Sequence, residues 1–336
     1  MSIREFYRNH LRDTPVGTAA RGVVRAAFSA RHLLTRELPA QARSLSARAA
    51  QAIIETKQAI YAPLRAKYQL AGNIWYRGRY VGRYYATRVR PALSWLFRSR
   101  ETSNFTYDLT ERNRAHLASM LAVVLKRPVT EITGYIDELA HDEALKRRVI
   151  DRVTALGRGV GLDPRVGFGR REGWYALVRA LKPRVVIETG VEKGLGATVL
   201  CAALLRNKEE GHPGRYYGTD IDSGAGILWD EHYRSTGTIL YGDSIESLQA
   251  LKEDIDLFIN DSDHSAEYEA REYRVILPKL SRDAVILADN AHVTDELYTF
   301  ARDNGREFLF FREEPANHWY LGAGIGLSFK QTDRAS

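Results

Sequence analysis

Acidic and amide side chains stand where two apolar stretches of the chain end. Asp261 follows the predicted strand 255–260, and Asp289 and Asn290 close the predicted strand 284–289. Neighbouring parallel strands lie about 4.8 Å apart, so side chains at such ends can converge on one ion. Carboxylate and amide oxygens without a thiolate suit Mg²⁺, which keeps waters and leaves positions for substrate hydroxyls. The three residues are therefore predicted to bind Mg²⁺.

An imidazole follows the first of these acids at a spacing of three residues. A metal lowers the pKa of a hydroxyl bound to it, and a neutral His264 beside Asp261 would remove the proton near pH 7. His264 is therefore the predicted catalytic base. The alternative is a solvent-facing residue at a helix start, with Asp261 or Ser262 as the cap. His292 and His318 are weaker pocket residues, because unmatched histidines are commonly structural.

A glycine-rich turn follows another predicted strand, 184–188, which ends at Glu188. The glycines of the turn are Gly190, Gly194 and Gly196. A tight turn needs glycine for conformational reasons alone. The next predicted strand, 215–220, ends at an acidic residue, where the ribose diol of a cofactor would be hydrogen-bonded.

The spacing of the loop separates the two common cofactors that carry this ribose. The glycines do not follow the G-x-G-x-x-G order of dinucleotide sites. Glu-Thr-Gly-x-x-x-Gly-x-Gly instead resembles the first motif of class I S-adenosylmethionine-dependent methyltransferases, and the resemblance extends over residues 171–330. It implies that Gly190 and its neighbours pass under the methionine moiety of S-adenosyl-L-methionine, that Asp220 holds the ribose, and that Asp243 lies by the adenine.

The acidic motifs are similar to two metal-dependent O-methyltransferase groups, the catechol and caffeoyl-coenzyme A type and the macrolide-sugar type. The first group has the Asp…Asp-Asn triad with a lysine as base, where this chain has His264. The second group has the histidine, but its second metal pair is Glu-Asp. The mixture implies methyl transfer to a hydroxyl of a sugar, a glycan or glycolipid, or a secondary metabolite, while Asn290 leaves a catechol open.

Strand and helix patterns alternate from residue 184 to residue 330. This alternation predicts an α/β fold, Rossmann-like and doubly wound, with a mostly parallel seven-stranded sheet, an N-terminal helical extension and an antiparallel pair formed by the last two strands. Helices are also expected from Asp108 and Glu111 to Lys126, and over 131–139 and 142–156. The predicted regions are a basic arm at 1–102, a helical lid at 103–170 and the cofactor-binding domain at 171–336.

The arm differs in charge from the rest of the chain. Residues 1–100 hold 19 Lys and Arg against 4 Asp and Glu, a net charge of +15, while the remainder carries −8. Apolar residues recur there at helical spacing, with breaks expected near Pro39 and Pro63. Aromatic rings interleave with arginines after Trp75. An anionic membrane surface fits both features, and the alternatives are nucleic acid and a homo-oligomerisation arm.

The composition limits the compartment and the rival functions. One cysteine, Cys201, the polar first residues and the absence of an apolar run of about 18 residues favour a cytosolic chain, peripheral at the inner face of a membrane. A nucleic-acid methyltransferase recruited by the arm is the rival enzyme, although Asn260-Asp261-Ser262-Asp263 replaces the Asn/Asp-Pro-Pro-aromatic motif of amino-methylating relatives. The other rival is a non-catalytic membrane-surface or assembly protein.

Overall fold

The computed structural model describes residues 40–331 of the chain. Backbone contacts divide the chain into two compact units, Met1–Tyr85 and Ala86–Ser336. Helix α3 (Ala40–Arg98) belongs to both units. Among residues 40–331, none of the helices combines the length and apolar character needed to cross a bilayer.

Helix α3 runs without interruption through Pro63, so the predicted break there is wrong, whereas Pro39 lies outside the described residues. An interior proline removes one backbone hydrogen bond and costs about 3 kcal/mol. Here it is flanked by strong helix formers, including Ala62, Ala66 and Lys67. The hydrogen bonds of the neighbouring turns thus keep the helix continuous.

The helices after the arm agree closely with the sequence pattern. The first begins at Thr110, whose side chain accepts a hydrogen bond from the Asn113 backbone N–H, so the cap is not the predicted Asp108. The threonine hydroxyl is the oxygen within reach of the third N–H of the helix. The helical segments of this region are α4 (Glu111–Leu125), α5 (Val129–Ala140), α6 (Glu143–Leu156), the short 3-10 helix η2 (Arg158–Val160) and α7 (Arg171–Leu181).

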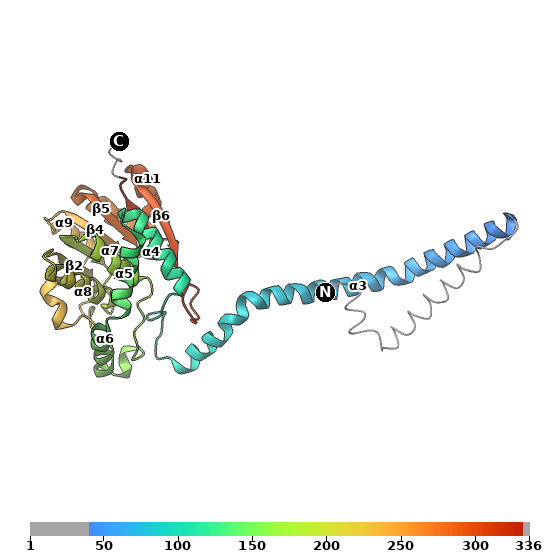
Figure 1. The fold of residues 1–336 in the computed structure, drawn as a ribbon, viewed down its shortest axis with the longest axis horizontal. Coiled ribbons are helices and arrows are strands. Elements are labelled where there is room, and N and C mark those ends of the chain that lie inside the picture. Colours follow the sequence, from blue (N-terminus) through green and yellow to red (C-terminus); the bar gives the residue numbers. More distant parts are fainter. Residues whose placement is uncertain (1–39, 332–336) are drawn as a thin grey trace. The chain divides into compact units, whose positions relative to one another are not determined.

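Seven strands form one sheet in the order β3-β2-β1-β4-β5-β7-β6, with β7 antiparallel to both neighbours. The predicted mostly parallel sheet and the antiparallel final pair are therefore confirmed (Figure 1). The strands are β1 (Val185–Thr189), β2 (Arg215–Asp220), β3 (Gly237–Tyr241), β4 (Ile255–Asn260), β5 (Leu280–Ala288), β6 (Glu307–Arg312) and β7 (Gly324–Phe329).

Helices connect most of the strands. The observed boundaries differ from the predicted ones mainly at the ends of individual elements. The connecting segments are α8 (Leu195–Glu209), η3 (Glu231–Thr236), α9 (Ser244–Ala250), α10 (Ala266–Ile276), η4 (Leu277–Lys279) and α11 (Glu296–Asp303). Strand β5 begins four residues before the predicted 284, and α11 begins three residues after the predicted 293. Shifts of this size are usual for element boundaries that are read from sequence alone.

Two apolar layers enclose the sheet. In β4, Leu257 and Ile259 pack in the core layer that contains α4 to α8, whereas Phe258 between them packs with α9, α10 and α11. Alternation of this kind places successive side chains on opposite faces of a strand. The region 103–170 is thus part of the main core: Leu117, Ile132 and other residues of α4 to α6 are fully buried in it.

Backbone hydrogen bonds continue past the carboxyl ends of the central strands. The N–H of Gly190 donates to Thr219, that of Asp261 to Thr189, and that of Asp289 to Asn260. The three predicted motifs consequently leave the sheet at the same level, on adjacent strands β1, β4 and β5. Ligands of such sheets bind at this edge, where the strand order reverses between β1 and β4.

Candidate functional site

Gly190 joins the two halves of this edge. Its φ of +85° lies in the left-handed region that glycine adopts freely. A Cβ at this position would overlap the backbone carbonyl of Asp261 and lie 2.8 Å from the Cα of Ser262. The residue therefore lets the glycine loop after β1 lie directly against the acidic turn after β4.

The cofactor half of the edge, defined as the glycine loop and the ends of β2 and β3, is ordered by carboxylates. Both oxygens of Asp220 accept backbone hydrogen bonds of 2.8 Å, from Glu192 and from Asp222. Asp243 caps α9, accepting from the Ile245 N–H at 2.7 Å and from the Tyr268 hydroxyl at 3.0 Å. Each carboxylate oxygen can accept a further bond, so contact with a ribose or an adenine stays a prediction compatible with this geometry.

The start of the glycine loop is buried. Gly194 precedes α8, and Gly196 lies in its first turn, where a Cβ would overlap the Glu188 carboxyl group and meet the Trp174 ring at 2.7 Å. Glu188 accepts a hydrogen bond from Tyr216. Burial raises the pKa of Glu188 to about 8, partly offset by Tyr216. The Glu188 carboxyl group thus packs against Gly196 and supports the glycine loop.

The acidic half of the edge, defined as the turns after β4 and β5, brings three of the predicted side chains together. Ligand atoms of Asp261, His264 and Asp289 all lie within 4.8 Å of one another. Burial, then the neighbouring Asp289 carboxylate, raises the pKa of Asp261 well above its usual range. Two carboxylates held this closely favour a proton or a cation between them.

Asn290 contacts the same cluster through its amide nitrogen. Its Nδ2 donates to Asp289 Oδ2 at 3.2 Å and faces His264 Nε2 at 3.1 Å. Its φ of +50° is a left-handed conformation that asparagine tolerates well. To serve as the predicted metal ligand, Asn290 must rotate its amide so that Oδ1 faces the cluster.

The His264 ring lies between the carboxyl groups of Asp261 and Glu269. The sequence position of His264 does not by itself predict this arrangement. Nε2 is 3.7 Å from Asp261 Oδ1, and Nδ1 is 3.7 Å from Glu269 Oε1. Glu269 is almost completely buried and accepts a hydrogen bond from Thr294. Glu269 raises the pKa of His264, burial lowers it, and Asp289 raises it further, with a net upward shift. If the Asn290 amide donates to Nε2 of a neutral ring, the ring proton is on Nδ1, which faces Glu269.

Glu269 was not among the predicted site residues. Glu269 stands in the first turn of α10. Helix N-termini favour negative charge, so an acidic residue at this position does not by itself indicate a functional site. Only the turn between β4 and α10 places it behind the imidazole. It is therefore a positioning residue for His264.

Arg170 is the largest departure from the predicted site. Its Nε and Nη2 pair with the two oxygens of Asp289, forming a two-pronged ion pair. Arg170 is 8% exposed and Asp289 is fully buried. Burial opposes the charge of Arg170, but Asp289, Tyr107 and Glu313 outweigh it, so the pKa of the guanidinium is raised. A resident cation thus already neutralises one predicted metal ligand.

A second layer of contacts holds Arg170 in place. Its Nη1 donates to the Tyr107 hydroxyl at 2.8 Å, and that hydroxyl donates to Glu313. The Tyr107 ring lies so close to the loop before α7 that a Cβ at Gly169 would overlap it. Arg170 was not among the predicted site residues, and its partner Asp289 is 119 residues away in the chain.

The residues fit a hard divalent cation by the chemistry of their donors. Three carboxyl groups, those of Asp261, Asp289 and Glu313, interact with the guanidinium of Arg170, and the neighbouring Arg171 acts on Asp261 and Glu313. Glu269 lies behind His264. Glu269 Oε1 and Glu313 Oε1 are buried without a hydrogen-bond partner. Acidic oxygens with one imidazole, and an excess of negative charge, suit Mg²⁺ or Mn²⁺. The Arg170–Asp289 pair is what such an ion must displace.

Aromatic side chains of the loop between β6 and β7 stand beside this cluster. His318 is 5.7 Å from Tyr107 and 5.6 Å from Trp319, ring centre to ring centre, and Trp319 lies 4.7 Å from Trp95. Burial lowers the pKa of His318 to about 4, so its ring is neutral at pH 7. His292 is exposed. His318 thus packs on Tyr107, the residue that hydrogen-bonds Arg170, whereas His292 is an exposed residue of the turn after β5.

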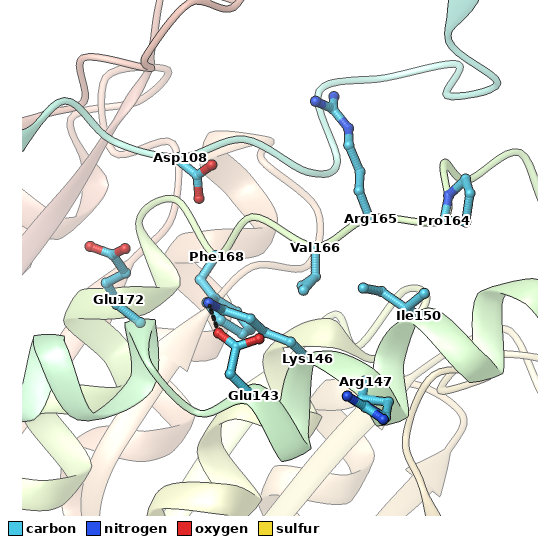
Figure 2. Close-up of a pocket in the computed structure, with 11 residues that line it drawn as sticks. Asp108, Glu143, Lys146, Arg147, Ile150, Pro164, Arg165, Val166, Phe168 and Glu172 are labelled. Atoms are coloured by element: carbon cyan, nitrogen blue, oxygen red, sulfur yellow. Dashed lines mark hydrogen bonds and ion pairs between the residues drawn. The ribbon is translucent and has the colours of Figure 1, made fainter.

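A cavity of about 510 Å³ is lined mainly by residues of α6 and of the loop 164–168 that precedes α7. Figure 2 shows its mixed lining, in which Lys146 pairs with Glu143 at 2.8 Å while Arg165, Phe168 and Glu172 face the same space. Its lining contains none of the predicted site residues. Burial, opposed by Arg114, raises the pKa of Glu172 to about 7.

Comparison with known proteins agrees with this architecture. Residues 187–291 match a family model described as a methyltransferase domain. No curated protein sequence matches the chain significantly.

Three solved structures with a similar arrangement are remote in sequence. SAH-bound methyltransferase PaMTH1 of Podospora anserina is 15% identical, with 60% of this chain and 94% of that chain covered and a TM-score of 0.43. TomG, an O-methyltransferase of tomaymycin synthesis in Streptomyces achromogenes solved with SAM, is 15% identical, with 57% and 91% covered and a TM-score of 0.42. An O-methyltransferase of Bacillus cereus with SAH is 14% identical, with 60% and 100% covered and a TM-score of 0.42. The match of residues 187–291 to a methyltransferase-domain model agrees with the resemblance of this chain to class I S-adenosylmethionine-dependent methyltransferases.

Proposed function

We propose that the chain transfers the methyl group of S-adenosyl-L-methionine to a hydroxyl of a sugar, a glycan or glycolipid, or a secondary metabolite, with Mg²⁺ as a second cofactor. The observation that carries the proposal is the imidazole of His264. It lies 3.7 Å from Asp261, at the sheet edge where Gly190 and Asp220 also lie. A base, a cluster of acids and a glycine loop thus share one edge.

The residues of the chain divide the work between orientation and proton transfer. His264 accepts the proton of the hydroxyl at Nε2, and Glu269 stabilises the imidazolium through Nδ1–H. Asp220 and Asp243 would orient the cofactor so that its methyl group lies in line with the acceptor oxygen. The aromatic loop with His318 and Trp319 would exclude water beside the acceptor.

A bound Mg²⁺ would supply a positive charge that lowers the pKa of the acceptor hydroxyl. Asp261 and Asp289 would hold it, with Asn290 after rotation of its amide. Full-length protein should lose methyl transfer in excess EDTA and regain it with Mg²⁺ or Mn²⁺. Asp261→Ala should abolish that recovery while changing cofactor affinity much less. Undiminished transfer in EDTA would show that these acids act without a metal.

The acceptor can be identified by comparing cells with and without the gene. Mass spectrometry of polar metabolites, glycans and glycolipids should show one species that is lighter by a methyl group, about 14 Da, in the cells without it. Calorimetry of the purified chain should show binding of S-adenosyl-L-methionine and not of NAD, because the loop lacks the dinucleotide spacing. Preference for NAD would contradict the proposal.

We further propose that the arm, residues 1–102, directs a cytoplasmic enzyme to an anionic membrane surface. On α3, Tyr76, Tyr80 and Tyr84 follow one another at four-residue spacing and are 49%, 61% and 73% exposed. Arg79 and Arg83 border this stripe. Exposed rings beside arginines suit headgroup depth, where each basic residue adds about 1 kcal/mol near anionic lipid.

Flotation with full-length protein tests the arm. The wild type should float with anionic vesicles and much less with neutral ones, and Tyr→Ser changes at 76, 80 and 84 should reduce flotation. Changing Arg77, Arg79 and Arg83 to Gln serves as the charge control, with a loss confined to anionic vesicles. Failure to float, together with a stable oligomer that the variants dissociate, would make the arm an assembly device, and tight binding of single-stranded oligonucleotides would favour the nucleic-acid alternative.

A further inference from the structure

The ion pair between Arg170 and Asp289 closes the metal position. Both oxygens of Asp289 are engaged by the guanidinium, and the carboxylate has no exposed surface. A divalent ion that uses Asp289 must therefore take at least one oxygen from Arg170. Breaking a buried ion pair is strongly unfavourable unless the freed charge finds another partner.

Such a partner lies beside Arg170. Glu313 is 2% exposed, and its Oε1 is buried without a hydrogen-bond partner. The Tyr107 hydroxyl touches both groups, accepting from Arg170 Nη1 at 2.8 Å and donating to Glu313. Among the groups that raise the pKa of Arg170, Asp289 acts most strongly, followed by Tyr107 and then by Glu313. The guanidinium thus has a second buried carboxylate within its own hydrogen-bond network.

We propose that Arg170 is a latch on the metal site, which pairs with Asp289 before the ion binds and with Glu313 afterwards. This inference rests on the proposed Mg²⁺ dependence. The latch keeps Asp289 neutralised in the metal-free enzyme and lowers the affinity for the ion by the difference between the two pairings. Arg170 and Glu313 are positioning residues in this scheme, since neither needs to touch the acceptor.

Two substitutions should shift metal affinity in opposite directions. Arg170→Met removes the competitor, and Mn²⁺ should bind about 10–100-fold more tightly, because the ion no longer has to break a buried pair. Glu313→Gln keeps an acceptor for the Tyr107 hydroxyl but removes the second charge, and Mn²⁺ should bind several-fold more weakly. Arg306→Met is the matched control: Arg306 is as buried as Arg170, but its guanidinium donates to Ser328 and to the Ala284 carbonyl and to none of the site residues. The affinity of this control variant for Mn²⁺ should stay within about 2-fold of that of the wild type.

The experiment is a titration of each full-length protein with Mn²⁺, with free ion measured by electron paramagnetic resonance and cofactor binding measured in parallel by calorimetry. Circular dichroism checks folding, and Glu313→Gln decides the question alone if Arg170→Met does not fold. Equal or weaker Mn²⁺ binding by Arg170→Met, or unchanged binding by Glu313→Gln, overturns the latch. If none of the proteins binds Mn²⁺, the latch and the Mg²⁺ site both fail, whereas loss of the methyltransferase function itself would be seen as absent binding of S-adenosyl-L-methionine.

Discussion

The two halves of the sheet edge are built from contacts of different range. In the cofactor half, Asp220 binds backbone groups 28 and 2 residues away, and Asp243 binds one that is 2 residues away. In the acidic half, Arg170 reaches Asp289 across 119 residues, and Tyr107 reaches Glu313 across 206. Local contacts repeat wherever the same short motif occurs, whereas distant contacts depend on how the whole chain packs.

This difference also separates the electrostatics of the halves. Carboxylates of the cofactor half are met by neutral backbone N–H groups and keep room for a ligand. In the acidic half, buried charges face each other: Asp261, Asp289 and Arg170 form one cluster, and the pKa of Asp261 is raised by burial and then by Asp289. A substitution in the cofactor half should therefore change the binding of one ligand. A substitution in the acidic half should change several charged side chains together.

Gly190→Ala should have the largest effect, because this residue joins the halves. The added Cβ overlaps the Asp261 backbone and a φ of +85° is strained for alanine, so the free energy of unfolding should fall by at least about 4 kcal/mol. Chemical denaturation measures it. Gly211→Ala is the control, with a φ of +86° but nothing within 4 Å, and should cost only about 1–2 kcal/mol. Equal losses in the two variants would show that the halves are not in forced contact.

His264→Ala should lower the rate of methyl transfer by about 10²–10⁴-fold at neutral pH, the range typical of losing a general base. The rate is measured with the acceptor found by mass spectrometry. The loss should shrink as pH rises, because hydroxide and the ionised acceptor replace the base. An unchanged pH–rate profile would make His264 a structural residue.

Glu269→Gln should shift the acid limb of the same profile. Glu269 is the main cause of the raised pKa of His264, so its neutralisation lowers that pKa and moves the limb to lower pH. NMR titration of the His264 ring gives the same shift without turnover. A limb that stays in place would show that Glu269 does not position the imidazole.

Asp220→Ala should weaken S-adenosyl-L-methionine binding by about 10–100-fold, the equivalent of one charge-assisted hydrogen bond. Mn²⁺ binding should hardly change, because Asp220 lies in the other half. Calorimetry with Asp220→Asn as the control separates charge from shape, since the amide keeps one acceptor oxygen. Equal cofactor binding by all three proteins would remove the ribose assignment.

The smallest effect concerns acid stability. The pKa of His318 is lowered to about 4, below the ordinary 6.5, so its contribution to stability is complete above pH 6.5 and is lost as the pH falls towards 4. His318→Gln should reduce the fall in Tm between pH 7 and pH 4.5 by a few degrees. Thermal melts of both proteins at the two pH values measure it. If the Tm of both proteins falls by the same amount between the two pH values, the loss of stability in acid comes from the carboxyl clusters alone.

The sequence by itself determined the sheet, its helices and the level at which the motifs leave it. Apolar runs such as 255–260 and 185–189 specify buried strands, and the glycines after β1 specify the turn, because both signals are local. The same locality explains the error at Pro63: a proline signals a break, but the helix formers around it determine the outcome.

Only the tertiary structure decided what surrounds the predicted base and acids. Asp261, His264, Asp289 and Asn290 were visible as a pattern, and parallel pairing of β4 with β5 brought them together. Arg170 and Glu269 carried no such signal, since an arginine in a polar loop and a glutamate in a first helical turn are ordinary in sequence. Arg170 reaches Asp289 because the loop before α7 packs against the end of β5, 119 residues away in the chain. Glu269 reaches His264 because the turn after β4 folds back on the start of α10.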